Sequence, residues 1–236
     1  MTEPAFPDDD AFSGGEPALL QLGGPAGVLE AIVEAPEPDV PARPVVAVMC
    51  HPLPTEGGTM HNKVVTMSAR ALRESGVTTV RFNFRGIGAS EGTFDDGQGE
   101  IEDLRAVAAW VRQQRPGAQL WLAGFSFGAY IALALSNEVV PGMLILIAPP
   151  AGRNWDLETL DPPECPWLVI QGEADEVVDP EAVYRWLEGL KPLQHPPELV
   201  RMPDTTHFFH RRLMDLRGAV KNGVKPYLPP PADRQG

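Results

Sequence analysis

The chain has 236 residues, of which 43% are hydrophobic and 22% charged, and its formal net charge is −13. This length and composition suit one globular α/β domain with a full core. The negative charge argues against binding to nucleic acid, which needs a basic face, and against docking on anionic lipid.

Two cysteines, Cys50 and Cys165, lie beside expected strands and are too few for a disulfide framework or a metal-ligand cluster. The first 15 residues are acidic and lack the basic and apolar stretches of a signal peptide. No apolar run approaches the ~20 residues that a membrane span needs. We therefore expect a cytoplasmic protein with no membrane span, no metal and no other cofactor.

Between an acidic beginning and a proline-rich end, short apolar runs alternate with helical patterns. We expect residues 1–16 and 229–236 to be flexible tails, and residues 17–228 to form a single domain. Strands are expected at 18–22, 28–35, 45–50, 77–82, 120–123, 143–148, 167–171 and 198–202, and helices at 60–74, 99–114, 129–137, 180–190 and 207–224. Gly23-Gly24 is the expected turn between the first two strands, which form an antiparallel pair. The alternation predicts a mostly parallel sheet of about eight strands, covered by helices on both faces, with ligands at the carboxyl ends of the strands.

The most informative segment is Gly124-Phe125-Ser126-Phe127-Gly128, which lies between an expected strand and an expected helix. A Gly-x-Ser-x-Gly sequence in this context is typical of a nucleophile elbow, a tight turn that lifts the serine hydroxyl above the edge of the sheet. Ser126 is therefore the predicted nucleophile.

A serine hydroxyl needs a base to react at neutral pH. Of the five histidines, His51, His61, His195, His207 and His210, we favour His207 because it follows the last expected strand. The chain order Ser, then Asp, then His supports this choice. His210 is expected within the final helix, pointing elsewhere.

The histidine in turn needs a carboxylate that fixes its tautomer. Asp175 follows a buried strand and lies between Ser126 and His207 in the chain, so it is the predicted partner. Asp179 directly precedes Pro180 and is better explained as a helix N-cap. Glu173 is expected to be a solvated loop charge.

Two backbone amides should stabilise the oxyanion that forms during acyl transfer. One should be the N–H of Phe127, the residue after the nucleophile, and the other should come from the loop after the third strand. In that loop Pro52 and Pro54 have no N–H, which leaves Leu53 as the donor. His51 is expected to pack or hydrogen-bond beneath this loop.

The segment after the fourth strand contains Gly86 and Gly88 but lacks the third glycine of a dinucleotide-binding fingerprint. We therefore expect no nucleotide cofactor there, and we expect Arg85 to form a structural ion pair rather than to bind substrate.

With these residues in place, the chain resembles the α/β-hydrolase superfamily from about Leu19 to Tyr227. Within it, the chain is similar to small bacterial hydrolases without a cap that are related to dienelactone hydrolases and esterases. The resemblance rests on three segments: residues 51–64, with His-Pro-x-Pro followed by Gly-Gly-Thr-Met-x-Asn-Lys-Val; residues 81–86, Arg-Phe-Asn-Phe-Arg-Gly; and residues 207–209, His-Phe-Phe. It implies an α/β-hydrolase fold and the triad Ser126, Asp175 and His207. Dienelactone hydrolases themselves use a cysteine nucleophile, so the serine here departs from their pattern.

The superfamily usually inserts its cap after the sixth strand, where this chain has only residues 149–166. That connection is too short for a cap domain, so we expect an open site that accepts a small ester or a bulkier acylated substrate.

The sequence thus predicts a serine hydrolase that cleaves carboxylic esters or thioesters through an acyl-enzyme. Alternatives are an amide or peptide hydrolase or an acyltransferase using the same triad, a non-catalytic binding protein with this fold, and, least favoured, a nonhydrolytic lyase or perhydrolase. The oligomeric state is left open.

Overall fold

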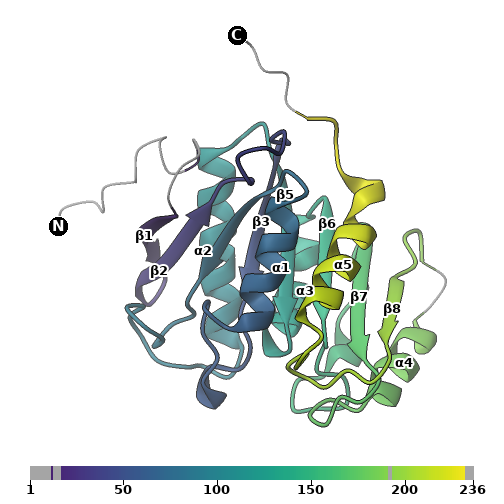
Figure 1. The fold of residues 1–236 in the computed structure, drawn as a ribbon. Helices are drawn as coiled ribbons and strands as arrows, with labels where there is room; N and C mark the ends of the chain where they lie inside the picture. Colours follow the sequence, from purple (N-terminus) through teal and green to yellow (C-terminus); the bar gives the residue numbers. More distant parts are fainter. Residues whose placement is uncertain (1–11, 13–16, 191–192, 232–236) are drawn as a thin grey trace.

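The computed structural model describes residues 12, 17–190 and 193–231. Most of the two predicted tails, residues 1–16 and 229–236, therefore lies outside the described residues. The described part forms one eight-stranded sheet with helices on both faces, as expected (Figure 1).

The strands are β1 (Ala18–Gly24), β2 (Gly27–Glu34), β3 (Val45–Cys50), β4 (Thr78–Phe82), β5 (Gln119–Phe125), β6 (Met143–Ile147), β7 (Trp167–Gly172) and β8 (Glu198–Met202). The helices are α1 (Lys63–Arg73), α2 (Gln98–Gln114), α3 (Phe127–Val139), α4 (Pro180–Gly189) and α5 (Leu213–Val224). The strand order across the sheet is β1-β2-β4-β3-β5-β6-β7-β8. Only the β1–β2 and β2–β4 pairs are antiparallel, and the other neighbours run parallel.

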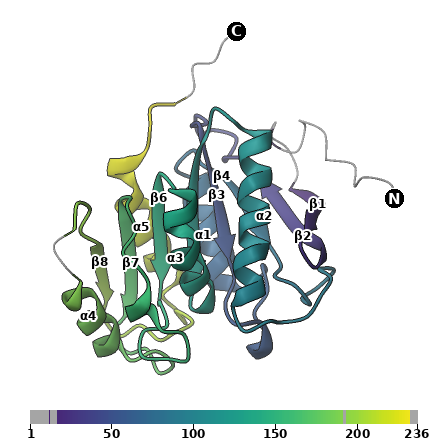
Figure 2. The ribbon, with the colours of Figure 1, turned by 180° about the vertical axis from the view of Figure 1, so that it is seen from behind.

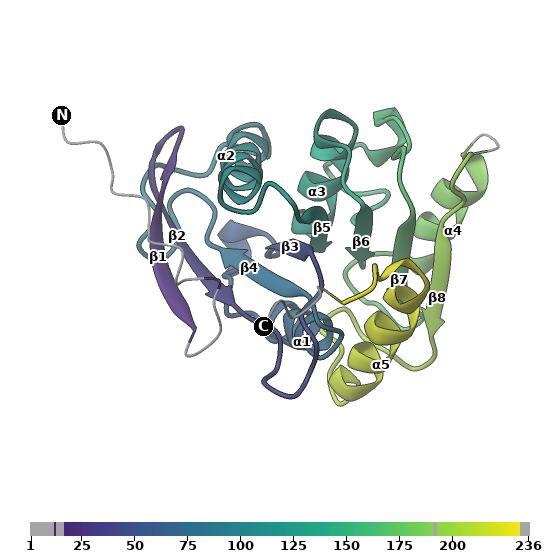
Figure 3. The same ribbon diagram turned by 90° about the horizontal axis from the view of Figure 1, so that it is seen from above.

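Two hydrophobic cores lie on the two faces of the sheet. Helices α1 and α5 cover one face, seen in front in Figure 1, and α2 and α3 cover the other, seen in front in Figure 2. The view from above shows α4 beside β8 on the same side as α2 and α3 (Figure 3). Residues of α2, α3 and α4 pack into one apolar cluster and residues of α1 and α5 into the other.

The central strands are continuous apolar runs because helices cover both of their faces. Every residue of β3, β4, β6 and β7 is buried. Because β3, β5, β7 and β8 run parallel, the loops that follow them leave the sheet at one edge. These are the loops that carry the residues predicted to do chemistry.

The predicted turn at Gly23-Gly24 is wrong. Both glycines belong to β1, where Gly24 pairs with Gly27, and the turn is formed by Pro25 and Ala26. Proline has a fixed φ suited to the second position of a turn and no amide N–H to give to a strand ladder. The strand therefore ends at the proline rather than at the glycines.

The final helix begins at Leu213 and not at residue 207. Two residues before it, Phe209 and Arg211, have left-handed φ values of 52° and 60°, which a helix cannot contain. Helix α1 also begins later than predicted, at Lys63, where the side chain of Asn62 caps the helix by accepting the N–H of Val64 at 2.9 Å. The other predicted bounds lie within two residues of the observed ones.

The connection between β6 and β7 contains one short 3₁₀ turn, Leu157–Thr159, and no cap domain, as expected. In the part of the chain that the structure describes, no helix has both the length and the apolar character required to cross a bilayer.

Candidate active site

Ser126 lies in a strained turn between the end of β5 and the start of α3. Its φ is 53° and its ψ is −120°, a region that residues other than glycine rarely adopt. The turn is held on both sides: the N–H of Ser126 donates to the carbonyl of Ile147 at 2.9 Å, and its own carbonyl accepts the N–H of Ala129 at 2.8 Å. Strain of this kind persists only where the surrounding structure enforces it, as it does at many functional sites.

The glycines that flank the turn are required by close backbone contacts. A Cβ on Gly124 would lie 2.1 Å from the carbonyl oxygen of Gly128. A Cβ on Gly128 would lie 2.4 Å from the carbonyl oxygen of Cys50 and 2.6 Å from that of His51. Because backbone atoms at the end of a central strand cannot move aside, the elbow closes only with glycine at both positions.

We expect Gly128→Ala to lower the free energy of unfolding by about 2–4 kcal/mol, since the added methyl group overpacks a rigid contact. Gly218→Ala is a matched control: it lies inside α5, and no atom lies within 4 Å of the added Cβ. That change should raise the free energy of unfolding by about 0.5–1 kcal/mol, because alanine favours a helix over glycine. Urea denaturation measures both, and equal midpoints for Gly128→Ala and wild type would contradict the contact.

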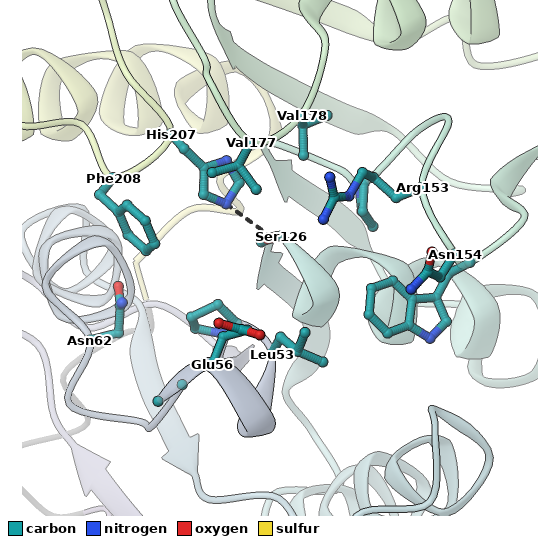
Figure 4. Close-up of a pocket in the computed structure, with 15 residues that line it drawn as sticks. Leu53, Glu56, Asn62, Ser126, Arg153, Asn154, Val177, Val178, His207 and Phe208 are labelled. Carbon is teal, nitrogen blue, oxygen red and sulfur yellow. Dashed lines mark hydrogen bonds between the residues drawn. The ribbon is translucent and has the colours of Figure 1, made fainter.

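Hydrogen bonds link Ser126, His207 and Asp175 in a row. Nε2 of His207 lies 3.1 Å from Oγ of Ser126, and Nδ1 lies 2.8 Å from Oδ2 of Asp175 (Figure 4). The imidazole is buried, with 2% of its residue surface exposed, and its ring packs 4.9 Å from the ring of Phe125. These distances are those of a nucleophile, its base and the group that orients the base.

Asp175 is tightly held in the loop after β7. Oδ1 accepts the N–H groups of Val177 and Val178 at 2.9 and 2.7 Å, and Oδ2 accepts Nε2 of Gln171 at 3.0 Å as well as the imidazole. Burial by itself would raise the pKa of this carboxyl group, but the hydrogen bonds from His207 and the two amides outweigh it and lower the pKa below its ordinary value. Asp175 is therefore an ionised acceptor that fixes the ring of His207.

The turns between β8 and α5 place His207 differently from His210. The N–H of His207 donates to Oε2 of Glu176 at 3.1 Å, which ties its backbone to the Asp175 loop. His210 lies in the same turns, outside any helix, and its side chain is exposed in a neighbouring cavity away from Ser126. The prediction that His210 lies in a helix is therefore wrong, and its side chain lies apart from the serine as expected.

The backbone N–H groups of Leu53 and Phe127, both near Ser126, have no acceptor among the described residues. Phe127 is the first residue of α3, where N–H groups lack partners within the helix. Leu53 precedes a 3₁₀ turn, Pro54–Glu56, and its carbonyl accepts the N–H groups of Glu56 and Gly58. Both N–H groups remain available to a ligand.

His51 lies beneath this loop, as expected. It is fully buried; its Nδ1–H donates to the carbonyl of Pro52 at 2.7 Å, and its Nε2 accepts the N–H of Phe84 at 3.1 Å. Burial lowers the pKa of His51 to about 4, so the ring is neutral near pH 7. Both ring nitrogens are occupied, which excludes His51 as the base.

The structure also confirms several structural roles predicted from the sequence. Asp179 caps α4 by accepting the N–H of Glu181 at 3.1 Å, and Glu173 is exposed. Arg85 forms an ion pair at 2.7 Å with the fully buried Asp103. The guanidinium group of Arg85 is therefore occupied by a structural ion pair and is not free to bind a substrate.

A cleft of about 460 Å³ opens above Ser126. The segments that follow five strands contribute its lining: Pro52, Leu53, Glu56, Gly57, Gly58 and Asn62 after β3, Ser126 after β5, Pro150, Arg153, Asn154 and Trp155 after β6, Val177 and Val178 after β7, and His207 and Phe208 after β8. This volume lies within the range of small-molecule sites. Within the described ranges, no three His, Cys, Asp or Glu side chains gather as metal ligands do.

The charged residues of this cleft, Glu56 and Arg153, could not be singled out from the sequence. Neither belongs to a motif, and both are exposed loop residues that a one-dimensional pattern cannot distinguish from solvated charges. Trp155, two residues after Arg153, is a large aromatic residue within a short connection, and it is the signal in the sequence that could have drawn attention to this segment.

Comparison with known proteins identifies a family and several proteins that this chain is similar to. The family described as "Serine aminopeptidase, S33" matches residues 48–163. An uncharacterized protein of Rickettsia prowazekii, RP471, is 37% identical over 169 residues, covering 70% of this chain and 69% of that protein.

Two solved structures are similar over nearly their whole length. XC6422 of Xanthomonas campestris, described as an α/β serine hydrolase without a lid, is 60% identical, with a TM-score of 0.88 and coverage of 97% of this chain and 99% of XC6422. An α/β serine hydrolase homologue from Coxiella burnetii is 42% identical, with a TM-score of 0.80 and coverage of 89% and 98% of the two chains.

Proposed function

The chain belongs to the α/β-hydrolase superfamily, as a small member without a lid, and we propose that it is a serine hydrolase that cleaves carboxylic esters or thioesters. The observation that carries this proposal is the row of hydrogen bonds from Ser126 through His207 to Asp175 at the floor of an open cleft.

In the proposed reaction, Oγ of Ser126 attacks the carbonyl carbon of the ester while Nε2 of His207 takes the hydroxyl proton. Asp175 holds the imidazole and stabilises its positive charge. The N–H groups of Leu53 and Phe127 donate to the oxyanion.

His207 then gives its proton to the leaving alcohol or thiol, and the acyl group stays on Ser126. In the second half of the reaction, His207 removes a proton from water, which attacks the acyl-enzyme and releases the acid. No cofactor is needed for either half.

A second candidate, peptide or amide cleavage, is favoured by the name of the matching family, Serine aminopeptidase. The match spans Ser126 but ends before Asp175 and His207. An aminopeptidase needs a group that holds the substrate's amino terminus, and among the described lining residues only Glu56 is acidic. Glu56 is exposed, so water competes with it for an ammonium group.

The test compares kcat/KM for p-nitrophenyl esters from acetate to palmitate, for acyl thioesters, and for alanine p-nitroanilide. We expect the esters and thioesters to exceed the anilide by at least about 100-fold, because an amide has the poorer leaving group and the cleft offers no buried partner for an ammonium ion. An anilide that matches or exceeds the esters would favour the peptidase. Absence of turnover, together with failure of a fluorophosphonate to label Ser126, would favour a binding protein.

A further inference from the structure

The cleft contains one positively charged side chain that the proposed reaction does not use. Arg153 lies in the loop after β6, is exposed, and lines the cleft together with Ser126. Figure 4 shows its guanidinium group turned toward Ser126. A substrate bound to Ser126 in a cleft of about 460 Å³ therefore lies within reach of this group.

Backbone and ring contacts hold the loop that carries Arg153 in place. Gly152 takes a left-handed φ of 70°, and the N–H of Arg153 donates to the carbonyl of Pro150 at 3.2 Å. Two residues on, the ring of Trp155 packs 4.8 Å from the ring of Phe127. These contacts fix the point from which the Arg153 side chain enters the cleft.

Arg153 also differs from most arginines of this acidic chain in its lack of an ionic partner. The chain has 32 acidic and 19 basic residues, so carboxylates are plentiful. Eight arginines form ion pairs: Arg70, Arg73, Arg81, Arg85, Arg105, Arg185, Arg212 and Arg217. Among the described residues, no side chain pairs with Arg153. A guanidinium kept unpaired beside a nucleophile is available to a ligand.

A neighbouring cavity on the Phe208 side of the cleft also carries positive charge. It measures about 340 Å³, shares Asn62 and Phe208 with the cleft, and is lined by Lys63, His210 and Arg211 without any acidic residue. Clustered charges of one sign in a hollow surface attract ions of the opposite sign even when the net charge of the chain is unfavourable. The Phe208 side of the cleft therefore attracts anions as well, while the lining of the cleft itself also carries the acidic Glu56.

We propose that Arg153 binds a carboxylate on the acyl part of the substrate, so that the preferred substrates are monoesters or monothioesters of dicarboxylic acids. This inference rests on the proposed hydrolase function. Arginine matches a carboxylate through two parallel N–H donors.

The acyl part is assigned from the arrangement around Ser126. His207 gives its proton to the leaving group, so the leaving group departs on the side of His207 and Phe208. Figure 4 shows Arg153 on the other side of Ser126 from Phe208. The acyl chain that remains on Ser126 therefore extends toward Arg153.

The test uses mono-p-nitrophenyl adipate and p-nitrophenyl hexanoate, which have the same leaving group and acyl chains of the same length but differ in a terminal carboxylate. The measured quantity is the ratio of their kcat/KM values. We expect Arg153→Gln to lower this ratio about 10–100-fold, as loss of a charge-assisted contact does, and Arg153→Glu to lower it further. Arg211→Gln, which removes the same charge from the neighbouring cavity, should change the ratio less than about threefold.

An equal effect of Arg153→Gln and Arg211→Gln would overturn the proposal, since general electrostatic attraction would then explain the preference. A dependence on Arg153 seen only when the carboxylate is on the leaving group, as in 4-acetoxybenzoate compared with phenyl acetate, would also overturn it.

A binding measurement separates this inference from the proposed function. Calorimetric titration of Ser126→Ala with mono-p-nitrophenyl adipate requires no turnover, and adding Arg153→Gln should weaken binding about tenfold or more. If wild type hydrolyses no ester, the hydrolase proposal fails, and the titration still decides whether Arg153 binds the carboxylate. If hexanoate is hydrolysed but the titration shows no effect of Arg153, only the carboxylate assignment fails.

Discussion

Replacing Ser126 with alanine is expected to lower kcat for p-nitrophenyl esters by about 10⁵–10⁶-fold, the loss typical of a removed serine nucleophile. The structure leaves no substitute for its hydroxyl. Among the described residues that line the cleft, no other serine, threonine or cysteine is present. Cys50, whose carbonyl lies against Gly128 of the elbow, is fully buried, and burial raises the pKa of its thiol far above the ordinary range, so it stays a neutral thiol.

The matched control is Ser136→Ala, in the same helix α3. Ser136 is buried, and its hydroxyl donates to the carbonyl of Leu133 at 2.7 Å, away from the cleft. Its loss should reduce stability slightly and leave kcat unchanged. The double variant Ser126→Ala/His207→Ala should be no slower than Ser126→Ala alone, because a base without its nucleophile contributes nothing. Residual activity of Ser126→Ala within tenfold of wild type would show that another group attacks the ester.

The fold could be predicted from the sequence largely because buried parallel strands appear in it as continuous apolar runs. Val45–Cys50 and Glu198–Met202 were predicted with their observed bounds. The elbow could also be predicted. The close contacts of Gly124 and Gly128 exclude any Cβ, so both positions must be glycine, and these glycines are visible in the sequence. The structure groups Ser126, His207 and Asp175 as the order of strands implied, and their catalytic roles remain predictions.

The sequence could not show where residues other than glycine take left-handed φ values and so interrupt a helix or strand. Phe209 and Arg211 take left-handed φ values, so the apolar pattern after His207 looked helical although the helix starts at Leu213. Phe209 is fully buried because the turn points it into the core beside Phe125. Arg153 is a different case, because it follows a turn at a glycine, Gly152, but no periodic pattern signals that its side chain enters the cleft.

We expect Asp175→Asn to lower kcat by about 10⁴-fold with little change in the position of the ring, because the substitution alters a hydrogen bond and not a volume. Oδ1 of Asp175 accepts two backbone N–H groups, from Val177 and Val178, so the carbonyl oxygen of asparagine must take that place. Its NH₂ group then faces Nδ1 of His207 and Nε2 of Gln171, where the carboxylate oxygen now accepts from both.

Two donors cannot face each other, so His207 must carry its proton on Nε2 and present Nδ1 to the asparagine. In that tautomer Nε2 cannot accept the proton of Ser126, which removes the base without moving it. Gln171 can adapt by turning its amide, because its Oε1 now has no hydrogen-bond partner, although the turn gives up the bond from its Nε2 to the carbonyl of Gly172. The loss should therefore fall on kcat rather than on folding, which thermal unfolding of the same variant measures.

Asp179→Asn makes the same chemical change four residues along, at the N-cap of α4, where asparagine caps about as well as aspartate. Its kcat should match that of wild type. If Asp175→Asn instead stays within tenfold of wild type, the tautomer of His207 does not depend on Asp175, and the carboxylate is only structural. If both variants lose activity equally, the effect comes from the loop between β7 and α4 as a whole and not from the hydrogen bond to the imidazole.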